Sequence, residues 1–445
     1  MKHWLLLLAC TLCCGLSAAV SLKVEAEKSV LPADREQEAL VRISVSADAL
    51  PRNIKATPRV NLSVALDCSS SMHGGNKIGH ALQAAKNAVD LLSDGDMFSL
   101  VTYSSSARVL IPTTQITSAA KNEIRQAIDS IRAGGTTALF AGVSLSAEEL
   151  RKNTGKPGWV NRLILLSDGQ ANVGPSSAVE LGRLGASLIK ESISVSTVGI
   201  GADYNEDLMT ALAQNSDGNF YFVENSTRLT LILEKELGSA LSVAAQDIKV
   251  RITCPSGIKP RGILGHQCKI NNQTIEINFN QLYAGHDRVL ILQLDVPPQA
   301  DGKSAPLADI KIEYKTADSE RINAVNRAVA VAFSSDSGQQ TASLNKDVSA
   351  SVVLQKSAVM RQEALQAADA GNYQAGAQKL KEANQMLQDN AAVTGNDEVI
   401  RNASLLEQDQ SKLEQAKEQP SSYNTTRKAI LGRGYQLKNS QQYKQ

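Results

Sequence analysis

Three oxygen-bearing side chains stand at alternate positions in the segment Asp67-Cys68-Ser69-Ser70-Ser71. An apolar run over residues 60–66 precedes the segment and predicts a buried strand, and a helical pattern begins near Lys77. Carboxylate and hydroxyl oxygens suit Mg²⁺, Mn²⁺ or Ca²⁺, whereas Zn²⁺ is expected to recruit imidazole or thiolate. The pattern therefore predicts a site for a hard cation, with simple capping of the following helix as the alternative.

Two later segments carry side chains of the same kind. Gly134-Gly135-Thr136-Thr137-Ala138-Leu139 opens another helix, and an apolar strand at residues 162–166 ends in Ser167-Asp168-Gly169. In this order and spacing, the three segments resemble the metal-ion-dependent adhesion site of a von Willebrand factor type A domain, over roughly residues 58–239. Bacterial exported proteins of this type and the inter-alpha-trypsin-inhibitor heavy chains have a similar architecture.

The resemblance implies a set of metal ligands in this chain. Thr137 is preferred to Thr136 because the family's threonine stands five residues before a small residue, which is Gly142 here. Thr136 remains an alternative. The implied ligands are Asp67, Ser69, Ser71, Thr137 and Asp168. Mg²⁺ is the first choice of cation, and Mn²⁺ and Ca²⁺ remain open.

Strand and helix patterns alternate between residues 58 and 239, which predicts a doubly wound, Rossmann-like parallel sheet with helices on both faces. The predicted strands are 61–66, 97–103, 108–111, 163–166, 194–200 and 220–223. The second and third strands are joined by three serines and read as a hairpin, which would place an antiparallel strand at one edge. In such sheets the turns that follow the strands gather at one end, where ligands bind.

The sequence patterns outside residues 58–239 divide the rest of the chain into separate regions. Residues 20–57 and 240–335 alternate with period two, so we predict that they pair in a β-sandwich in which the α/β domain is inserted or by which it is flanked. Residues 345–418 predict a helical hairpin region, and residues 419–445 a polar, disordered tail. Residues 1–19 have the charged start, short apolar core and small final residues of a signal peptide.

Composition limits the choice of partner and compartment. A net charge of +1 and 4% aromatic residues give no case for nucleic acid. The signal peptide predicts an extracytoplasmic protein that is secreted, periplasmic or on the cell surface, and membrane or envelope association after export stays open. An oxidising compartment permits a disulfide between Cys254 and Cys268, and Cys68 is interpreted as a small buried hydrophobe.

The resemblance implies a metal-dependent adhesion module that captures an Asp or Glu side chain of a protein ligand. Neither catalysis nor a small-molecule substrate is expected. One alternative is a metal-assisted hydrolase or phosphatase with Asp67 as nucleophile, but the chain has no second aspartate two residues later, no HExxH helix and no GxSxG elbow. A purely structural assembly scaffold is the other alternative.

Overall fold

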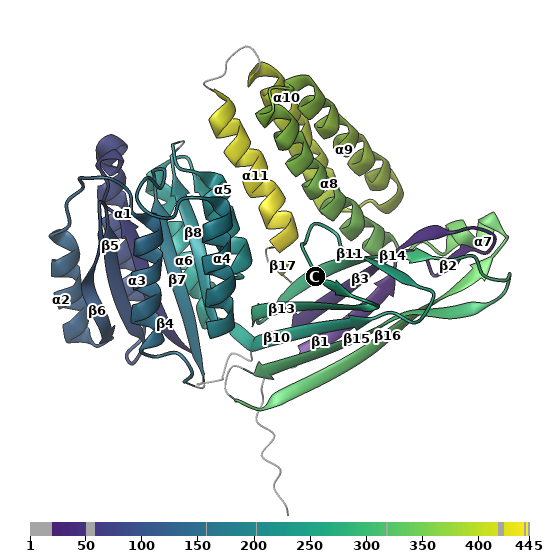
Figure 1. Cartoon of the computed structure of the whole chain (residues 1–445), viewed down its shortest axis with the longest axis horizontal. Coiled ribbons are helices and arrows are strands. Elements are labelled where there is room, and N and C mark those ends of the chain that lie inside the picture. The colour runs from purple at the N-terminus through teal and green to yellow at the C-terminus, as the bar shows by residue number, and fades with distance from the viewer. Residues whose placement is uncertain are drawn as a thin grey trace, which may run out of the picture.

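The computed structural model describes residues 20–49, 58–156, 158–201, 203–316, 319–416, 422–439 and 442–443. An α/β domain, a pair of β-sheets and a group of long helices lie beside one another (Figure 1). The predicted signal peptide, residues 1–19, lies outside the described residues. Among the helices of the described residues, none combines the length and the apolar character that a membrane span requires.

The α/β domain is built on one sheet with the strand order β6-β5-β4-β7-β8-β9. Neighbouring strands are parallel except β5 and β6, which form the predicted antiparallel edge. The strands are β4 (Arg59–Asp67), β5 (Met97–Tyr103), β6 (Ala107–Gln115), β7 (Trp159–Ser167), β8 (Ile193–Ile200) and β9 (Phe220–Val223). The doubly wound fold predicted from the sequence is confirmed.

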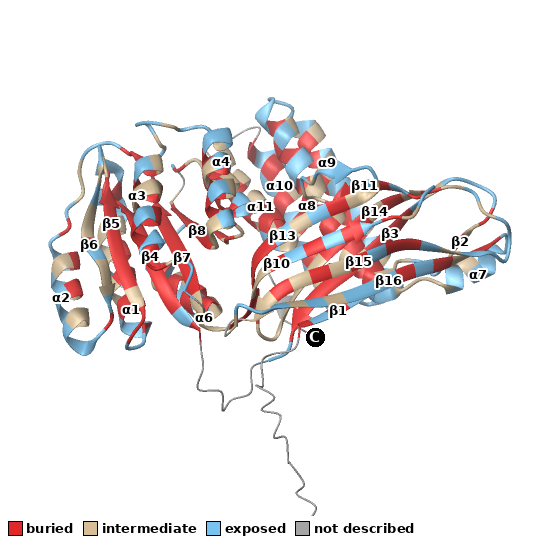
Figure 2. Cartoon of the chain, turned by 60° about the horizontal axis from the view of Figure 1, so that its bottom comes forward, coloured by how far each residue is buried: buried red, intermediate tan, exposed pale blue. Residues whose placement is uncertain are grey.

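Helices cover both faces of this sheet. The alternate residues Val60, Leu62, Val64 and Leu66 of β4 share one hydrophobic cluster with α1 (Lys77–Leu91), α2 (Ser118–Asp129) and α6 (Leu229–Leu241). Ala65 lies in the opposite cluster, with α3 (Leu139–Arg151), α4 (Ala178–Leu188) and α5 (Glu206–Asn215). The central strands are consequently buried on both sides, as Figure 2 shows, which explains their continuous apolar sequence. Short 3-10 turns, η1 (Ser70–Asn76), η2 (Ile189–Glu191) and η3 (Ser226–Arg228), complete the domain.

The strands before and after the α/β domain form two further sheets around one shared core. One sheet has the order β1-β3-β14-β11, with β17 also paired to β14, and the other has the order β12-β13-β10-β15-β16-β2. The early strands are β1 (Val20–Ala26), β2 (Val30–Pro32) and β3 (Gln37–Ala47). The later strands are β10 (Val243–Thr253), β11 (Lys259–Ile263), β12 (Ile270–Asn271), β13 (Thr274–Tyr283), β14 (His286–Val296), β15 (Ser304–Thr316), β16 (Ile322–Ser334) and β17 (Gln442–Tyr443).

Pairing between β3 and β14 makes the α/β domain an insertion within the two-sheet domain. The pairing runs antiparallel from Gln37 opposite Val296 to Ser46 opposite Asp287. A buried arginine also joins the two domains: Arg162 of β7 donates to the side-chain oxygens of Gln281 at 2.6 Å and Tyr283 at 2.8 Å, both on β13. The insertion is thus fixed by both backbone pairing and a desolvated polar contact.

The described cysteines are free thiols, so the bridge considered between Cys254 and Cys268 is not formed. Burial raises the pKa of Cys254 to about 11 and that of Cys68 to about 12. Both buried groups therefore remain neutral thiols at pH 7, as expected of small apolar side chains.

Helices form the C-terminal part of the chain: α7 (Ser337–Ala342), α8 (Lys346–Asp369), α9 (Tyr373–Thr394), α10 (Asp397–Ala416) and α11 (Tyr423–Asn439). The C-terminal helical region predicted from the sequence is confirmed, but the prediction of a disordered polar tail is wrong for residues 423–439. Ile430 and Tyr435 of α11 are buried, and Tyr435 donates to the carbonyl of Gly218 at 2.7 Å. The few apolar residues of α11 are therefore used in packing, and polar contacts hold the rest.

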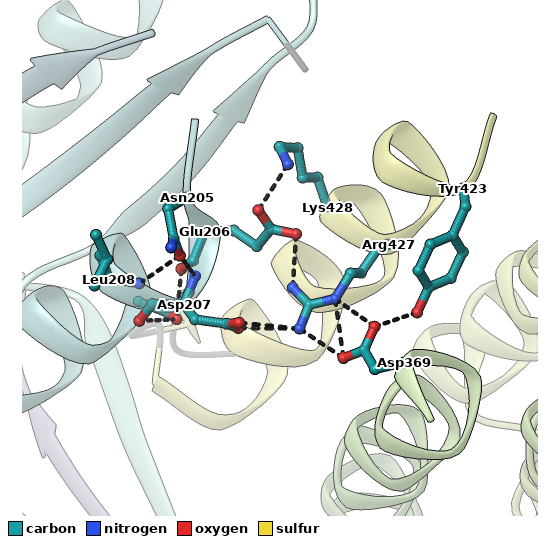
Figure 3. A network of polar contacts seen from close by, with 9 residues as sticks. Asn205, Glu206, Asp207, Leu208, Asp369, Tyr423, Arg427 and Lys428 are labelled. Carbon is teal, nitrogen blue, oxygen red and sulfur yellow. Dashed lines mark hydrogen bonds and ion pairs between the residues drawn. The ribbon is translucent and has the colours of Figure 1, made fainter. Parts of the chain in front are cut away.

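Two adjacent basic residues attach α11 to its neighbours (Figure 3). Arg427 contacts Glu206 at 2.6 Å and Asp207 at 3.1 Å, both in the first turn of α5, and Asp369 of α8 at 2.8 Å. Lys428 contacts the other carboxylate oxygen of Glu206 at 2.6 Å. One side chain, Arg427, thus links the α/β domain to the helical region.

Substituting Arg427 by Met should loosen α11. The change leaves the mostly buried Glu206 with one partner fewer, and we expect a loss of about 1–3 kcal/mol in the free energy of unfolding. Hydrogen exchange should become faster at the backbone amides of α11. Lys379→Met is the control, because it removes a half-exposed pair with Glu363 on the surface of the helical region. Equal α11 exchange in both variants would contradict the role of Arg427.

Candidate metal centre

The carboxyl ends of two neighbouring strands bring the candidate carboxylates together. Strands β4 and β7 run parallel with Leu66 beside Leu166, so Asp67 ends one strand where Ser167 and Asp168 follow the other. Both aspartates are fully buried. Segments separated by about 100 residues in sequence therefore present two carboxylates at the carboxyl ends of two neighbouring strands.

Both oxygens of Asp67 accept hydrogen bonds from groups of the site. Oδ1 accepts from the backbone N–H of Ser69 at 2.8 Å, and Oδ2 accepts from the hydroxyl of Ser167 at 2.7 Å. Burial raises the pKa of Asp67 to about 6, and the negative charge of Asp168 adds to that rise, although the bonds from the two serines oppose it. A cation beside this carboxylate would favour its ionised form.

Three hydroxyl groups converge beside Gly169. Ser69 Oγ lies 3.0 Å from Ser71 Oγ, and Ser71 Oγ donates to Oδ1 of Asp168 at 2.7 Å. A Cβ atom placed on Gly169 would lie 3.3 Å from Ser71 Oγ, 3.3 Å from Thr137 Oγ1 and 3.8 Å from Ser69 Oγ. The space kept open by this glycine is therefore lined by hydroxyl oxygens.

The two candidate threonines differ in position. Thr137 is 3% exposed, and its hydroxyl makes no hydrogen bond within the described part of the chain. Thr136 is exposed, and its hydroxyl lies 3.0 Å from the hydroxyl of Ser105. The structure thus places Thr137, and not Thr136, beside the serines and Gly169.

Backbone bonds fix the loop that carries Thr137. Gly134 N–H donates to the carbonyl of Cys68 at 2.6 Å, and Ser70 N–H donates to the carbonyl of Gly135 at 3.1 Å. Asn172 Oδ1 accepts from Thr137 N–H at 2.8 Å. The sequence predicted that the segment with Asn172 forms the rim after Asp168, but it did not predict this bond to Thr137.

The small residue at position 142 allows α3 to approach the sheet. A Cβ on Gly142 would lie 2.5 Å from the ring of Tyr103. Burial raises the pKa of Tyr103 well above its ordinary value, so its phenol stays protonated and donates to the carbonyl of Leu166 at 3.0 Å. Gly142 thus sets the depth of the helix whose first turn follows Thr137.

Lys77 ends a glycine-rich segment that the sequence predicts to form the rim of the site, and it contacts the site directly, which the sequence did not predict. Its Nζ lies 2.7 Å from Oδ2 of Asp168. A charged residue at the first position of the helix after the serine segment was the only sequence signal for this contact. Asp168 therefore faces a hydroxyl with one oxygen and an ammonium group with the other.

The available donors fit a hard divalent cation. Three hydroxyls line the space beside Gly169, and the carboxylates of Asp67 and Asp168 accept hydrogen bonds from Ser69 and Ser71. The thiol of Cys68 instead lies 3.6 Å from the carbonyl of Leu66. Among the described residues, no group of three His, Cys, Asp or Glu side chains lies close enough together to hold a metal ion by itself. A cation here would therefore depend on hydroxyl ligands, and the individual ligand roles remain a prediction.

Comparisons with known proteins show which proteins the α/β domain is similar to. Residues 61–235 match the family model of the von Willebrand factor type A domain. An uncharacterized Escherichia coli protein, YfbK, is 29% identical over 218 residues, which are 49% of this chain and 37% of YfbK. Mouse inter-alpha-trypsin inhibitor heavy chain H2 is 29% identical over 175 residues, or 38% of this chain and 18% of that protein. The chain thus covers well under half the length of each of these two relatives.

A solved structure is similar over most of the chain. The von Willebrand factor type A protein from Catenulispora acidiphila has a TM-score of 0.70 and 20% sequence identity, and the match covers 87% of this chain and 90% of that one. The similarity therefore extends beyond the α/β domain, and at this identity it concerns the fold alone.

Substituting Gly169 by Ala should weaken cation binding. The added methyl group would press on the hydroxyls of Ser71 and Thr137, and we expect a loss of about 1–3 kcal/mol in the free energy of Mg²⁺ binding, measured by calorimetry. Gly238→Ala on α6 is the control because its methyl group meets no atom within 4 Å. Wild-type Mg²⁺ affinity in Gly169→Ala would show that the cation does not bind among these hydroxyls.

Proposed function

We propose that the von Willebrand factor type A domain of this chain is a cation-dependent protein-binding module. Asp67, Ser69, Ser71, Thr137 and Asp168 would hold a divalent cation, with Mg²⁺ as first choice. The partner would be a protein that presents an Asp or Glu side chain. The observation that carries the proposal is the convergence of three hydroxyls, including the unbonded one of Thr137, beside two buried carboxylates.

The choice of an acidic ligand follows from the charge of the donors. The serines and the threonine are neutral, so the two aspartates alone offset the charge of a bound divalent cation, which would still supply an electrophilic contact for an outside carboxylate. A charge-assisted contact of this kind is stronger where water is partly excluded. The residues of the chain hold and orient the cation, and the partner supplies the remaining oxygen.

Exposed segments around the buried donors support binding of a macromolecule. Residues 70–76, after Ser69, are exposed apart from the buried Met72, and residues 172–174, in the turn after Asp168, are also exposed. Val173 in that second segment is 37% exposed and adds an apolar surface. A protein ligand could thus contact the rim while one of its acidic side chains enters the site.

Substituting Thr137 by Val tests this function with little risk to the fold, since the lost hydroxyl bonds to nothing in the described part of the chain. The immobilised protein should retain partners from an envelope extract in Mg²⁺ and release them in chelator. We expect Thr137→Val to lose this retention while its melting temperature in chelator stays within about 2 °C of wild type. Amidation of the carboxyl groups in the extract should also abolish retention.

Thr136→Val is the matched control, because the exposed hydroxyl of Thr136 contacts Ser105 and does not lie beside Gly169 with Ser69 and Ser71. This variant should retain partners as wild type does. Retention that survives chelator, or that is equal in the two threonine variants, would refute cation-dependent capture.

Export is part of the same proposal and rests on the signal-like pattern of residues 1–19. The protein would then act outside the cytoplasm. Amino-terminal sequencing of the mature protein from its native host should give a start near Val20. A start at Met1 would contradict export by this route.

A further inference from the structure

Lys77 supplies a positive charge at the candidate metal centre. Its Nζ lies 2.7 Å from Oδ2 of Asp168, and its side chain is only 17% exposed. Asp168 is fully buried. Within the described residues, no other lysine or arginine forms an ion pair with Asp67 or Asp168. Lys77 is therefore the positive partner of a site that would otherwise hold two buried negative charges.

The position of Lys77 is fixed at both ends. It is the first residue of α1, and its backbone N–H donates to the carbonyls of Gly74 and Met72 in η1. At the other end, a Cβ on Gly201 would lie 3.4 Å from both Cε and Nζ of Lys77. The ammonium group thus lies between the turn that follows β8 and Asp168, and its charge is held at the site by packing.

Counting charges shows what this lysine changes. With both carboxylates ionised, the empty site carries −1 with Lys77 and −2 without it. A divalent cation brings the loaded site to +1 with Lys77 and to zero without it. Lysine at this position therefore weakens the attraction for the cation and strengthens the attraction of the loaded site for an anion.

We propose that Lys77 determines ligand selectivity at this site by making the cation-loaded site positively charged, at the expense of cation affinity. The proposal rests on the cation-binding part of the proposed function and assigns the preference for an anionic ligand to one residue. A neutral oxygen ligand would gain less than an anion from the extra charge. Lys77 is a selectivity residue that acts through charge and is not a cation ligand.

Two opposite effects distinguish this role from a structural one. A lysine that only braced the loops would, when removed, weaken binding of both the cation and the anion. A lysine that sets the charge would, when removed, strengthen binding of the cation and weaken binding of the anion. The two roles are therefore distinguished by whether removing Lys77 raises or lowers the cation affinity while it lowers the anion affinity.

The first experiment measures cation binding alone. Calorimetric titration of Mg²⁺ into Lys77→Met, without any partner, should show an affinity about tenfold or more above wild type. In chelator this variant should melt below wild type, because Asp168 loses its partner, and saturating Mg²⁺ should raise its melting temperature by more than it raises that of wild type. Lys77→Arg, which keeps the charge, should remain close to wild type in Mg²⁺ affinity.

The second experiment uses acetate as the anionic probe. In protein loaded with Mn²⁺, relaxation of the acetate methyl protons reports acetate bound near the cation. Acetate affinity should fall about threefold or more in Lys77→Met. Lys86→Met is the matched control, because it removes one positive charge from the same helix at an ion pair with Asp129, away from the site. This control should leave both affinities unchanged.

The outcomes separate this inference from the proposed function. If wild type binds no Mg²⁺, the proposed function fails before Lys77 is tested. If wild type binds Mg²⁺ but Lys77→Met binds it equally or more weakly, or binds acetate equally, the charge-setting role of Lys77 is refuted and the cation site stands.

Discussion

Two buried carboxylates at the ends of neighbouring parallel strands are the constraint around which this domain is built. Asp67 and Asp168 are removed from water and lie close enough for the charge of one to raise the pKa of the other. Such a pair needs hydrogen-bond donors and positive charge. Serine donors, the ammonium group of Lys77 and the proposed divalent cation meet that need, and the surrounding loops are bonded to one another so that these groups stay in place.

The rest of the chain holds this domain from two sides. Arg162 of β7 is fully buried and bonds to side chains of β13. These bonds fix the α/β domain to the two-sheet domain. Arg427 and Lys428 of α11 bind Glu206, which opens the helix after β8. Lys77 packs against Gly201 at the end of the same strand. The C-terminal helix and the candidate metal centre thus contact successive parts of one strand-to-helix connection.

Some features could be read from the sequence because they arise from local periodicity. Alternating strand and helix patterns predicted the doubly wound sheet. Each strand or helix buries an apolar face, and the spacing of its apolar residues shows which of the two it is. Helix α11 could not be read in this way, because few of its residues are apolar and part of its attachment comes from ion pairs with α5 and α8. Its partners are distant in sequence, and no local pattern encodes them.

The sequence by itself determined the kind of chemistry, an oxygen-lined site at the ends of parallel strands, because the strand pattern and the residue types are local properties. The family resemblance preferred Thr137 and left Thr136 open, and the tertiary structure decided between them. It alone showed which asparagine fixes the loop and which lysine faces Asp168. Thr136 and Thr137 are equivalent in type and adjacent in sequence, and burial separates them. The direction and environment of a side chain depend on packing between distant segments, which a single sequence does not specify.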